Sequence, residues 1–125
     1  WNIILAARRI EQAQQLANTF PDYHLLLTTF DLRPSTFDLI VNTTPLGMTP
    51  NIGTSPLPQN VILSPDIMIY DLVYNPRETK LVKDARAQGC SAVTGLGMLI
   101  EQAALAFEIW TGHTPPRDVL YDAVV

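Results

Sequence analysis

Residues 67–94, with the sequence IMIYDLVYNPRETKLVKDARAQGCSAVT, decide the fold of this chain. Two short apolar runs, Ile67–Val73 and Cys90–Thr94, have the length of strands, and a segment with helical character separates them. A strand, a helix and a second strand in this order are typical of a parallel sheet, because the helix carries the chain back to the edge where the next strand starts. The sequence therefore predicts a parallel β–α–β unit here.

The boundaries of the helix between these two strands are marked by capping residues. Asn75, Pro76 and Glu78 fall at the N-cap, N1 and N3 positions that such residues prefer. We expect the helix to run from there to about Gln88, with Gly89 at its C-terminal end.

The same alternation extends toward the N-terminus. The predicted strands are Asn2–Ala7 (NIILAA), His24–Thr29 (HLLLTT) and Phe37–Asn42 (FDLIVN), and apolar residues at helical spacing predict a helix from Ile10 to Phe20. The segment Thr44–Pro65 is rich in Pro, Gly, Asn and Ser, which predicts a long loop.

Two further helices are predicted toward the C-terminus. Gly97 leads into a helix that ends at Gly112, and its predicted apolar face contains Leu99, Ala103, Ala106 and Trp110. A last helix follows His113, with Thr114 as its cap, Pro115 in its first turn, and Val119, Leu120 and Val124 packing back on the body. Residues 1–125 therefore predict one α/β domain with three layers and a mostly parallel sheet.

The composition excludes several classes of protein. The chain has 125 residues, of which 47% are apolar and 16% charged, with a formal net charge of −4. An acidic chain lacks the basic surface that nucleic acids and anionic membranes require. No apolar run reaches the roughly 18 residues of a membrane helix, and no signal-like leader follows Trp1. We therefore expect a cytoplasmic protein that binds neither nucleic acid nor membrane, and the low charged share indicates that some apolar surface needs a partner.

The reactive side chains do not form a catalytic or metal-binding pattern. Cys90 is the single cysteine and lies in a predicted strand, and His24 and His113 are far apart in the sequence. We expect no disulfide and no metal site. No strand–turn–helix elbow presents a serine, and no pair of residues makes a convincing proton donor and acceptor.

Ligands of parallel α/β sheets bind beyond the carboxyl ends of the strands, so residues that follow the predicted strands are candidates. Arg8 and Arg9 follow the first strand, where dinucleotide-binding folds have an acid for the ribose hydroxyl or an arginine for a 2′-phosphate. The absence of an acid and the planar, two-pronged contacts of a guanidinium favour NADP over NAD. The alternative is a solvated basic pair at the start of a helix.

Two connections are candidates for contact with a nucleotide. NTTPLGM (residues 42–48) begins with short polar side chains, which either hydrogen-bond a ligand or satisfy the backbone of a turn. TGLGM (residues 94–98) joins a strand to a helix through two glycines. These permit close approach of a flat ligand, or serve only the tight connection.

Two single residues also stand out. Helical spacing places Glu101 and Glu108 on one face and Gln102 toward the apolar side, where its amide needs either a ligand or a backbone group as partner. Tyr74 follows an apolar strand, so its hydroxyl faces a cleft or the side chain is packed in the core.

Taken together, four segments resemble the C-terminal, NADP-binding domain of shikimate dehydrogenase: ARR (7–9), NTTPLGM (42–48), YDLVYNPRET (70–79) and GLGMLIEQAALAFEIWTG (95–112). The resemblance covers nearly the whole chain. It implies a Rossmann-like fold, NADP as cofactor, and the reversible NADPH-dependent reduction of 3-dehydroshikimate to shikimate in aromatic amino-acid biosynthesis.

The resemblance implies roles for individual residues along the cofactor. Ala7, Arg8 and Arg9 match the family's Asn-Arg-Thr segment at the adenosine 2′-phosphate, where Arg8 matches the arginine and the other two depart from the motif. Thr43 matches the loop that runs along the cofactor.

Further residues match the reacting end of the family's site. Leu72 and Gly95 match backbone positions near the nicotinamide, and Met98 would pack beside it. Tyr74 and Gln102 match the two residues that this domain contributes to the shikimate site.

The resemblance also implies parts that this sequence does not contain. The chain has no GxGxxG turn for the pyrophosphate, and the family's catalytic lysine and aspartate belong to a separate substrate domain. We therefore expect a fragment that starts at the family's second strand and is inactive by itself. In the usual strand order 3-2-1-4-5-6 the first strand is central. The NIILAA and FDLIVN strands should then leave a gap of about 10 Å, roughly two strand spacings, or hold foreign backbone, instead of pairing directly.

Two other functions remain open at this point. The chain could be a noncatalytic nucleotide-binding or interaction module. It could also come from a related dehydrogenase that prefers quinate, because the substrate domain largely sets that preference. In every case, the sheet edges that the missing strand exposes would favour self-association.

Overall fold

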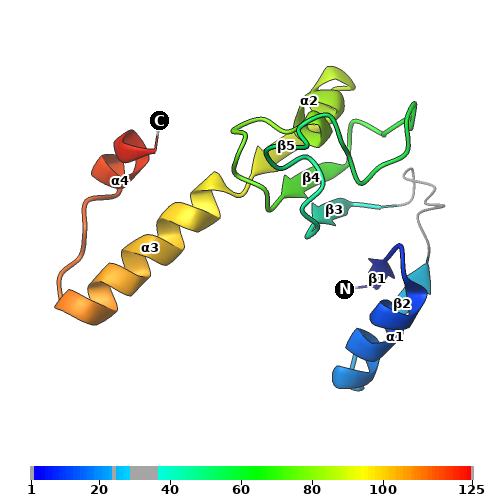
Figure 1. Cartoon of the computed structure of the whole chain (residues 1–125), viewed down its shortest axis with the longest axis horizontal. Helices are drawn as coiled ribbons and strands as arrows, with labels where there is room; N and C mark the ends of the chain where they lie inside the picture. The colour runs from blue at the N-terminus through cyan, green and yellow to red at the C-terminus, as the bar shows by residue number, and fades with distance from the viewer. Residues whose placement is uncertain (1, 24, 29–36, 125) are drawn as a thin grey trace.

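The computed structural model describes residues 2–23, 25–28 and 37–124 (Figure 1). Its strands are β1 (Ile3–Ala6), β2 (Leu25–Thr28), β3 (Leu39–Asn42), β4 (Met68–Asp71) and β5 (Ser91–Thr94), and its helices are α1 (Ile10–Thr19), α2 (Lys80–Ala87), α3 (Leu96–Thr111) and α4 (Arg117–Ala123). Every strand pair in these ranges is parallel, which confirms the predicted α/β class. None of the described helices is both long enough and apolar enough to cross a membrane.

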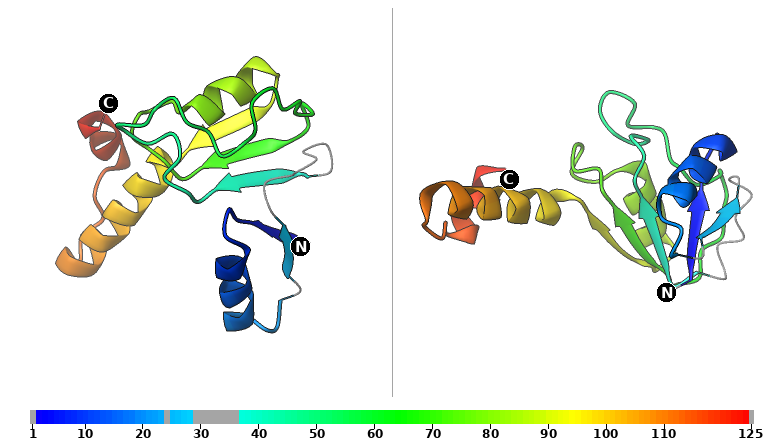
Figure 2. Two further views of the ribbon diagram at one scale, coloured as in Figure 1. Left: turned by 45° about the vertical axis from the view of Figure 1, so that its right-hand side comes forward. Right: turned by 90° about the horizontal axis from the view of Figure 1, so that it is seen from below.

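The strands form two sheets, in the orders β1–β2 and β3–β4–β5. Within the described ranges β1 does not pair with β3, which confirms that the NIILAA and FDLIVN strands avoid direct pairing. In the right-hand view of Figure 2 the strands follow one another in the order β5, β4, β3, β1, β2. This is the order of a doubly wound sheet without a strand between β1 and β3. The width of that separation stays a prediction.

The core of the larger sheet lies under α2. Ile40, Ile69 and Ala92 are register partners on neighbouring strands, and Ile69 and Ala92 are buried with Val82 and Ala85 of α2. The other buried members of this cluster are Leu57, Leu63, Ile67, Leu81 and Cys90. Full burial of an aliphatic side chain contributes about 1.5–3 kcal/mol, so this cluster holds α2 against β4 and β5.

The predicted start of α2 is wrong. Asn75, Pro76 and Glu78 all precede the helix, whose N-cap is Thr79. The Thr79 hydroxyl accepts a hydrogen bond from a backbone N–H three residues further on, at 3.3 Å. Asn75 is held by Thr49 instead: its carbonyl accepts from the Thr49 N–H at 3.1 Å, and its Oδ1 accepts from the Thr49 hydroxyl at 3.2 Å. These contacts keep Asn75 in a loop. Asn75 therefore binds Thr49 and does not cap α2.

The predicted ends of α2 and α3 are confirmed by two glycines. Gly89 lies just beyond α2 with φ of +86°, and Gly112 caps α3 with φ of +70°. Side chains with a Cβ rarely adopt this left-handed conformation, so glycine stops both helices.

The predicted apolar face of α3 is wrong. The buried residues of this helix are Ile100 and Ala104, whereas Ala103 is exposed and Trp110 is 81% exposed. α3 projects away from the sheet (Figure 1), so most of its length has no core to face. The spacing of apolar residues predicted the helix correctly, but it did not predict which of its residues are buried.

The predicted cap of α4 is also wrong. Thr114 and Pro115 precede the helix, whose N-cap is Pro116 in an extended conformation. A residue that precedes proline is pushed out of the helical region, so the two prolines delay the start of the helix. Val119 and Val124 were expected to pack on the body, but they are 57% and 41% exposed.

One face of the β3–β4–β5 sheet has little cover. Val41, Met68 and Val93, one on each strand, are 42%, 47% and 44% exposed. Their side chains alternate with those that face α2. This exposed apolar face agrees with the low share of charged residues in the sequence.

Candidate functional site

A pocket of about 420 Å³ lies beyond the carboxyl ends of β3 and β4. The segments that follow these two strands line it: Thr43, Thr44, Pro45, Met48, Thr49, Leu72, Val73, Tyr74 and Asn75. The structure thus brings together three residues that sequence reasoning selected, Thr43, Leu72 and Tyr74. Tyr74 is 47% exposed, so its hydroxyl is not packed away in the core.

Gly95 joins this pocket to α3 through a close backbone contact. A Cβ on Gly95 would lie 2.2 Å from the carbonyl oxygen of Leu72, and the Gly95 N–H donates to the carbonyl of Val73 at 3.2 Å. Because no side chain fits at Gly95, the start of α3 lies directly against the backbone that forms one wall of the pocket.

Met98 and Gln102 lie one turn apart on α3, outside the residues that line the pocket. Met98 is 40% exposed, and Gln102 is also exposed. Gln102 is thus solvent-exposed on a side of α3 that also carries the exposed apolar residues Met98 and Leu105. Its amide makes no hydrogen bond with the described part of the chain, so it is available to a ligand.

Ala7, Arg8 and Arg9 follow β1 in the smaller sheet, and they do not line the pocket. The Ala7 N–H donates to the carbonyl of Thr28 at 3.1 Å, which continues the β1–β2 ladder. Arg8 and Arg9 are exposed and form no ion pair within residues 2–23, 25–28 and 37–124. In both views of Figure 2, β1 and β3 point in the same general direction. The arginines follow the carboxyl end of β1, and Thr43 follows the carboxyl end of β3.

Three buried polar side chains form a network beside the pocket. Asn42 was a candidate of the NTTPLGM segment, and it accepts from the backbone of the turn, whereas sequence reasoning did not select Asp71 and Thr79 as site residues. Asn42 and Asp71 are register partners at the ends of β3 and β4, and Thr79 is the N-cap of α2. They are 2%, 0% and 0% exposed, respectively. Asp71 accepts hydrogen bonds from Asn42 Nδ2 at 2.8 Å and from Thr79 Oγ1 at 2.5 Å. The available signal was a single aspartate inside the otherwise apolar run IMIYDLV.

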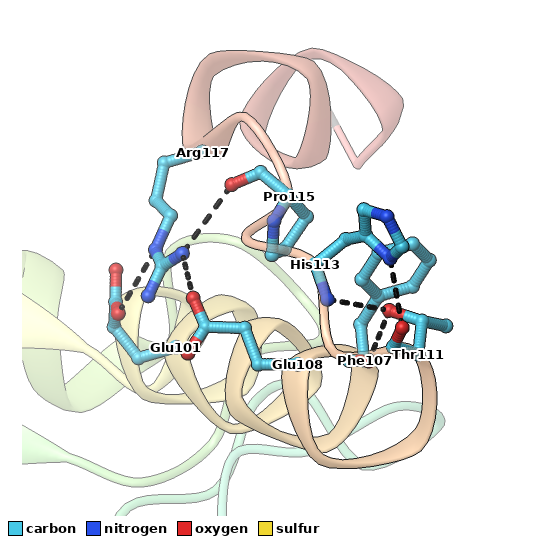
Figure 3. Close-up of polar contacts among 7 residues, drawn as sticks. All are labelled: Glu101, Phe107, Glu108, Thr111, His113, Pro115 and Arg117. Carbon is cyan, nitrogen blue, oxygen red and sulfur yellow. Dashed lines mark hydrogen bonds and ion pairs between the residues drawn. The ribbon is translucent and has the colours of Figure 1, made fainter.

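α4 holds the exposed helix α3 through one arginine (Figure 3). Arg117 Nε lies 3.4 Å from Glu101 Oε2, and Arg117 Nη1 lies 3.2 Å from Glu108 Oε1 and 3.3 Å from the carbonyl oxygen of Pro115. The hydrogen bond with Glu108 raises the pKa of Arg117. As the sequence predicted, Glu101 and Glu108 share a face of α3, and here both bind the same guanidinium.

The side chains that line the pocket are suited to binding. Hydroxyl, amide and apolar groups line it, with no histidine, lysine, acid or cysteine among them. Cys90 is buried, and burial raises the pKa of its thiol, so it is a poor nucleophile. Among the residues that the structure describes, no group of three or more His, Cys, Asp and Glu could hold a metal ion. A larger hollow of about 720 Å³ lies between α2 and the loop around residues 53–63, and it contains none of the predicted site residues.

Comparisons with known proteins agree with this arrangement. The family model of the shikimate 5′-dehydrogenase C-terminal domain matches residues 95–125. A curated shikimate dehydrogenase (NADP(+)) of Methanocaldococcus jannaschii is 38% identical over 131 residues, which cover 99% of this chain and 46% of that protein. The chain thus spans about half the length of the curated relatives it matches.

Two solved structures show the same fold. A shikimate dehydrogenase in complex with NADP+ has a TM-score of 0.85 at 36% identity, covering 98% of this chain and 45% of the other. A quinate dehydrogenase of Corynebacterium glutamicum in complex with NAD has a TM-score of 0.84 at 30% identity, covering 97% of this chain and 45% of the other. In sequence and in fold, the chain is homologous to the NADP-binding region of shikimate dehydrogenase.

Proposed function

We propose that this chain is the cofactor-binding part of an NADP-dependent shikimate dehydrogenase, which reduces 3-dehydroshikimate reversibly to shikimate. The observation that carries the proposal is the pocket that brings Thr43, Leu72 and Tyr74 together beyond the carboxyl ends of parallel strands. The homologous region of a related shikimate dehydrogenase has been solved with NADP+. NADPH supplies the hydride in this reaction when it is bound.

The residues of the chain fit the nicotinamide end of such a cofactor. The missing side chain of Gly95 lets backbone approach backbone, and the half-buried Leu72 lines the pocket beside it, which leaves room for a flat ring. Thr43 lies along the proposed path of the cofactor, and Met98 provides an apolar surface beside the ring. Tyr74 and Gln102 present a hydroxyl and an unpaired amide, which suit the hydroxyl groups of a cyclic acid.

The adenosine end is assigned to the segment Ala7–Arg9. Arg8 is the proposed contact to the 2′-phosphate, with Arg9 beside it, and both guanidinium groups are exposed. In the 125 residues no GxGxxG turn is present to bind the pyrophosphate, and no acid–base pair lines the pocket. We therefore propose that the chain alone binds NADPH weakly and is inactive. The substrate-binding site would be completed by further polypeptide. A cytoplasmic location is part of this proposal.

A quinate-type dehydrogenase is the second candidate, because the TM-score to the quinate dehydrogenase is nearly that of the shikimate dehydrogenase. The fold therefore does not separate these substrates. Activity of the complete gene product on shikimate and quinate, each with NADP and NAD, separates the two dehydrogenases. A product inactive with both acids would favour a noncatalytic module.

Substitution of Arg8 tests the proposed binding of NADP. In the complete enzyme, Arg8→Ala should weaken binding of NADPH by about 1.5–3 kcal/mol, the usual value of a hydrogen bond to a charged group, and leave NADH nearly unchanged. Titrations followed by nicotinamide fluorescence measure both affinities. Lys83→Ala, on the exposed surface of α2, is a control for the lost positive charge. Equal losses for the two cofactors would refute the proposed contact to the 2′-phosphate.

A further inference from the structure

Asp71 is a buried carboxylate that the proposed chemistry does not use. It is 0% exposed and forms no ion pair with any described residue. Its hydrogen bonds come from neutral donors: Asn42 Nδ2 and the Val73 N–H on Oδ1, and the Thr79 hydroxyl on Oδ2. Burying a charged group without a cation is costly, so these hydrogen bonds must compensate for much of the lost hydration.

The contacts of Asp71 lead to both walls of the pocket. On one side Asn42 connects Asp71 to Thr44. The Asn42 Oδ1 accepts from the N–H of Thr44 at 3.0 Å and from the Thr44 hydroxyl at 2.7 Å. Asn42 Nδ2 also donates to the carbonyl of Leu46 at 3.3 Å. On the other side Asp71 Oδ1 accepts directly from the Val73 N–H at 3.1 Å. One carboxylate thus connects the turn after β3 with the segment after β4.

Asp71 also fixes where α2 begins. The Thr79 hydroxyl donates to Asp71 Oδ2 while it accepts from the Val82 N–H at 3.3 Å. The single hydroxyl proton is therefore committed to the carboxylate. The N-cap of α2 and both pocket walls depend on the same side chain.

We propose that Asp71 is a positioning residue of the cofactor site, which holds the segments 43–46 and 72–74 at the separation that the ligand requires. The inference rests on the proposed function for the identity of the ligand, and on the hydrogen-bond network alone for the positioning. A substitution that removes both oxygens tests this role, because the network uses both of them. Asp71→Ala leaves the Asn42 amide, the Val73 N–H and the Thr79 hydroxyl without this acceptor, whereas an asparagine could still accept from Asn42 and Val73 and donate to the Thr79 hydroxyl.

Hydrogen exchange of the 125-residue chain tests the positioning without any ligand. In Asp71→Ala the amide of Val73 should exchange about 10- to 100-fold faster, the factor that corresponds to a lost hydrogen bond to a charged group. The amide of Thr44 should also exchange faster, because its acceptor Asn42 is no longer held by Asp71. The amides of Ile69 and Ala92 in the core strands should change much less. Asp84→Ala is the matched control, because it makes the same substitution at an exposed residue of α2.

Two further variants separate the branches of the network. Asn42→Ala should accelerate exchange at Thr44 and leave Val73 protected, whereas Thr79→Val should release the first turn of α2 and leave Thr44 protected. Exchange that rises uniformly over the chain, or stays unchanged at Thr44 and Val73, would overturn the positioning role. A uniform rise would mean that Asp71 only supports global stability.

NADPH titration followed by nicotinamide fluorescence links the network to the ligand. Asp71→Ala should weaken NADPH binding at least about fivefold while Asp84→Ala leaves it unchanged. Local release of Thr44 and Val73 with unaltered affinity would contradict the link to the cofactor site. If the unmodified chain shows no NADPH binding at all, the proposed function fails for this chain, and the exchange result still decides the positioning role.

Discussion

Substitution of Gly95 by alanine tests the contact between α3 and the pocket wall. A Cβ at this position would lie 2.2 Å from the carbonyl oxygen of Leu72 and 2.7 Å from its carbonyl carbon. Non-bonded atoms normally lie about 3.5 Å apart, so the start of α3 or the end of β4 must move by about 1 Å. The backbone of Gly95, with φ of −70° and ψ of 0°, is accessible to alanine, so the cost is steric. We expect the free energy of unfolding to fall by about 1–3 kcal/mol, the usual cost of overpacking.

Gly97→Ala is the matched control two residues further along. The nearest atom to a Cβ at Gly97 is the hydroxyl oxygen of Tyr121 at 3.6 Å, an ordinary contact. Alanine is favoured over glycine in a helix by about 0.5–1 kcal/mol, so this variant should be slightly more stable than the unmodified chain. Urea denaturation followed by circular dichroism measures both changes. Two variants with the same sign and size of effect would refute the steric reasoning about Gly95.

Two other predictions concern α4 and the buried thiol. Arg117→Ala should reduce the free energy of unfolding by less than about 1 kcal/mol because its ion pairs are partly exposed, yet hydrogen exchange in α4 should accelerate selectively; unchanged protection of α4 would contradict the role of this arginine. Burial raises the pKa of the Cys90 thiol above its ordinary value of 9.0, so its contribution to stability is fully present below about pH 9 and is lost as the pH rises through the raised pKa. Cys90→Ala should therefore flatten the decline of stability above that pH in denaturation curves, and an unaltered slope would argue against this effect.

The sequence was informative wherever local pattern and packing agree. The run IMIYDLV and the amphipathic segment before Gly89 predicted β4 and α2, because strand length and helical period report directly on which side chains are buried. The separation of β1 from β3 was predicted from the resemblance, which implied that the first and central strand of a doubly wound sheet is not part of this sequence.

Prediction failed where a long-range contact decides between two local choices. Asn75 and Thr79 are both good caps, and the choice depends on Thr49 and Asp71, which are distant in sequence. The burial of α3 depends on how far the helix projects from the sheet, which its own period does not encode. The candidate site shows the same limit: chain order placed Thr43, Leu72 and Tyr74 beyond strand ends, but the buried network beneath them required the register of β3 and β4.

The central claim is that NADPH binds where the segments after β3, β4 and β5 meet. A titration of the isotope-labelled chain with NADPH, followed by amide chemical shifts, tests it directly and detects even the weak binding expected without a pyrophosphate turn. We expect the largest shift changes at Thr43, Leu72 and Gly95, with smaller changes around Arg8 that NADH does not reproduce. Changes confined to the hollow around residues 53–63, or no change at millimolar NADPH, would contradict it.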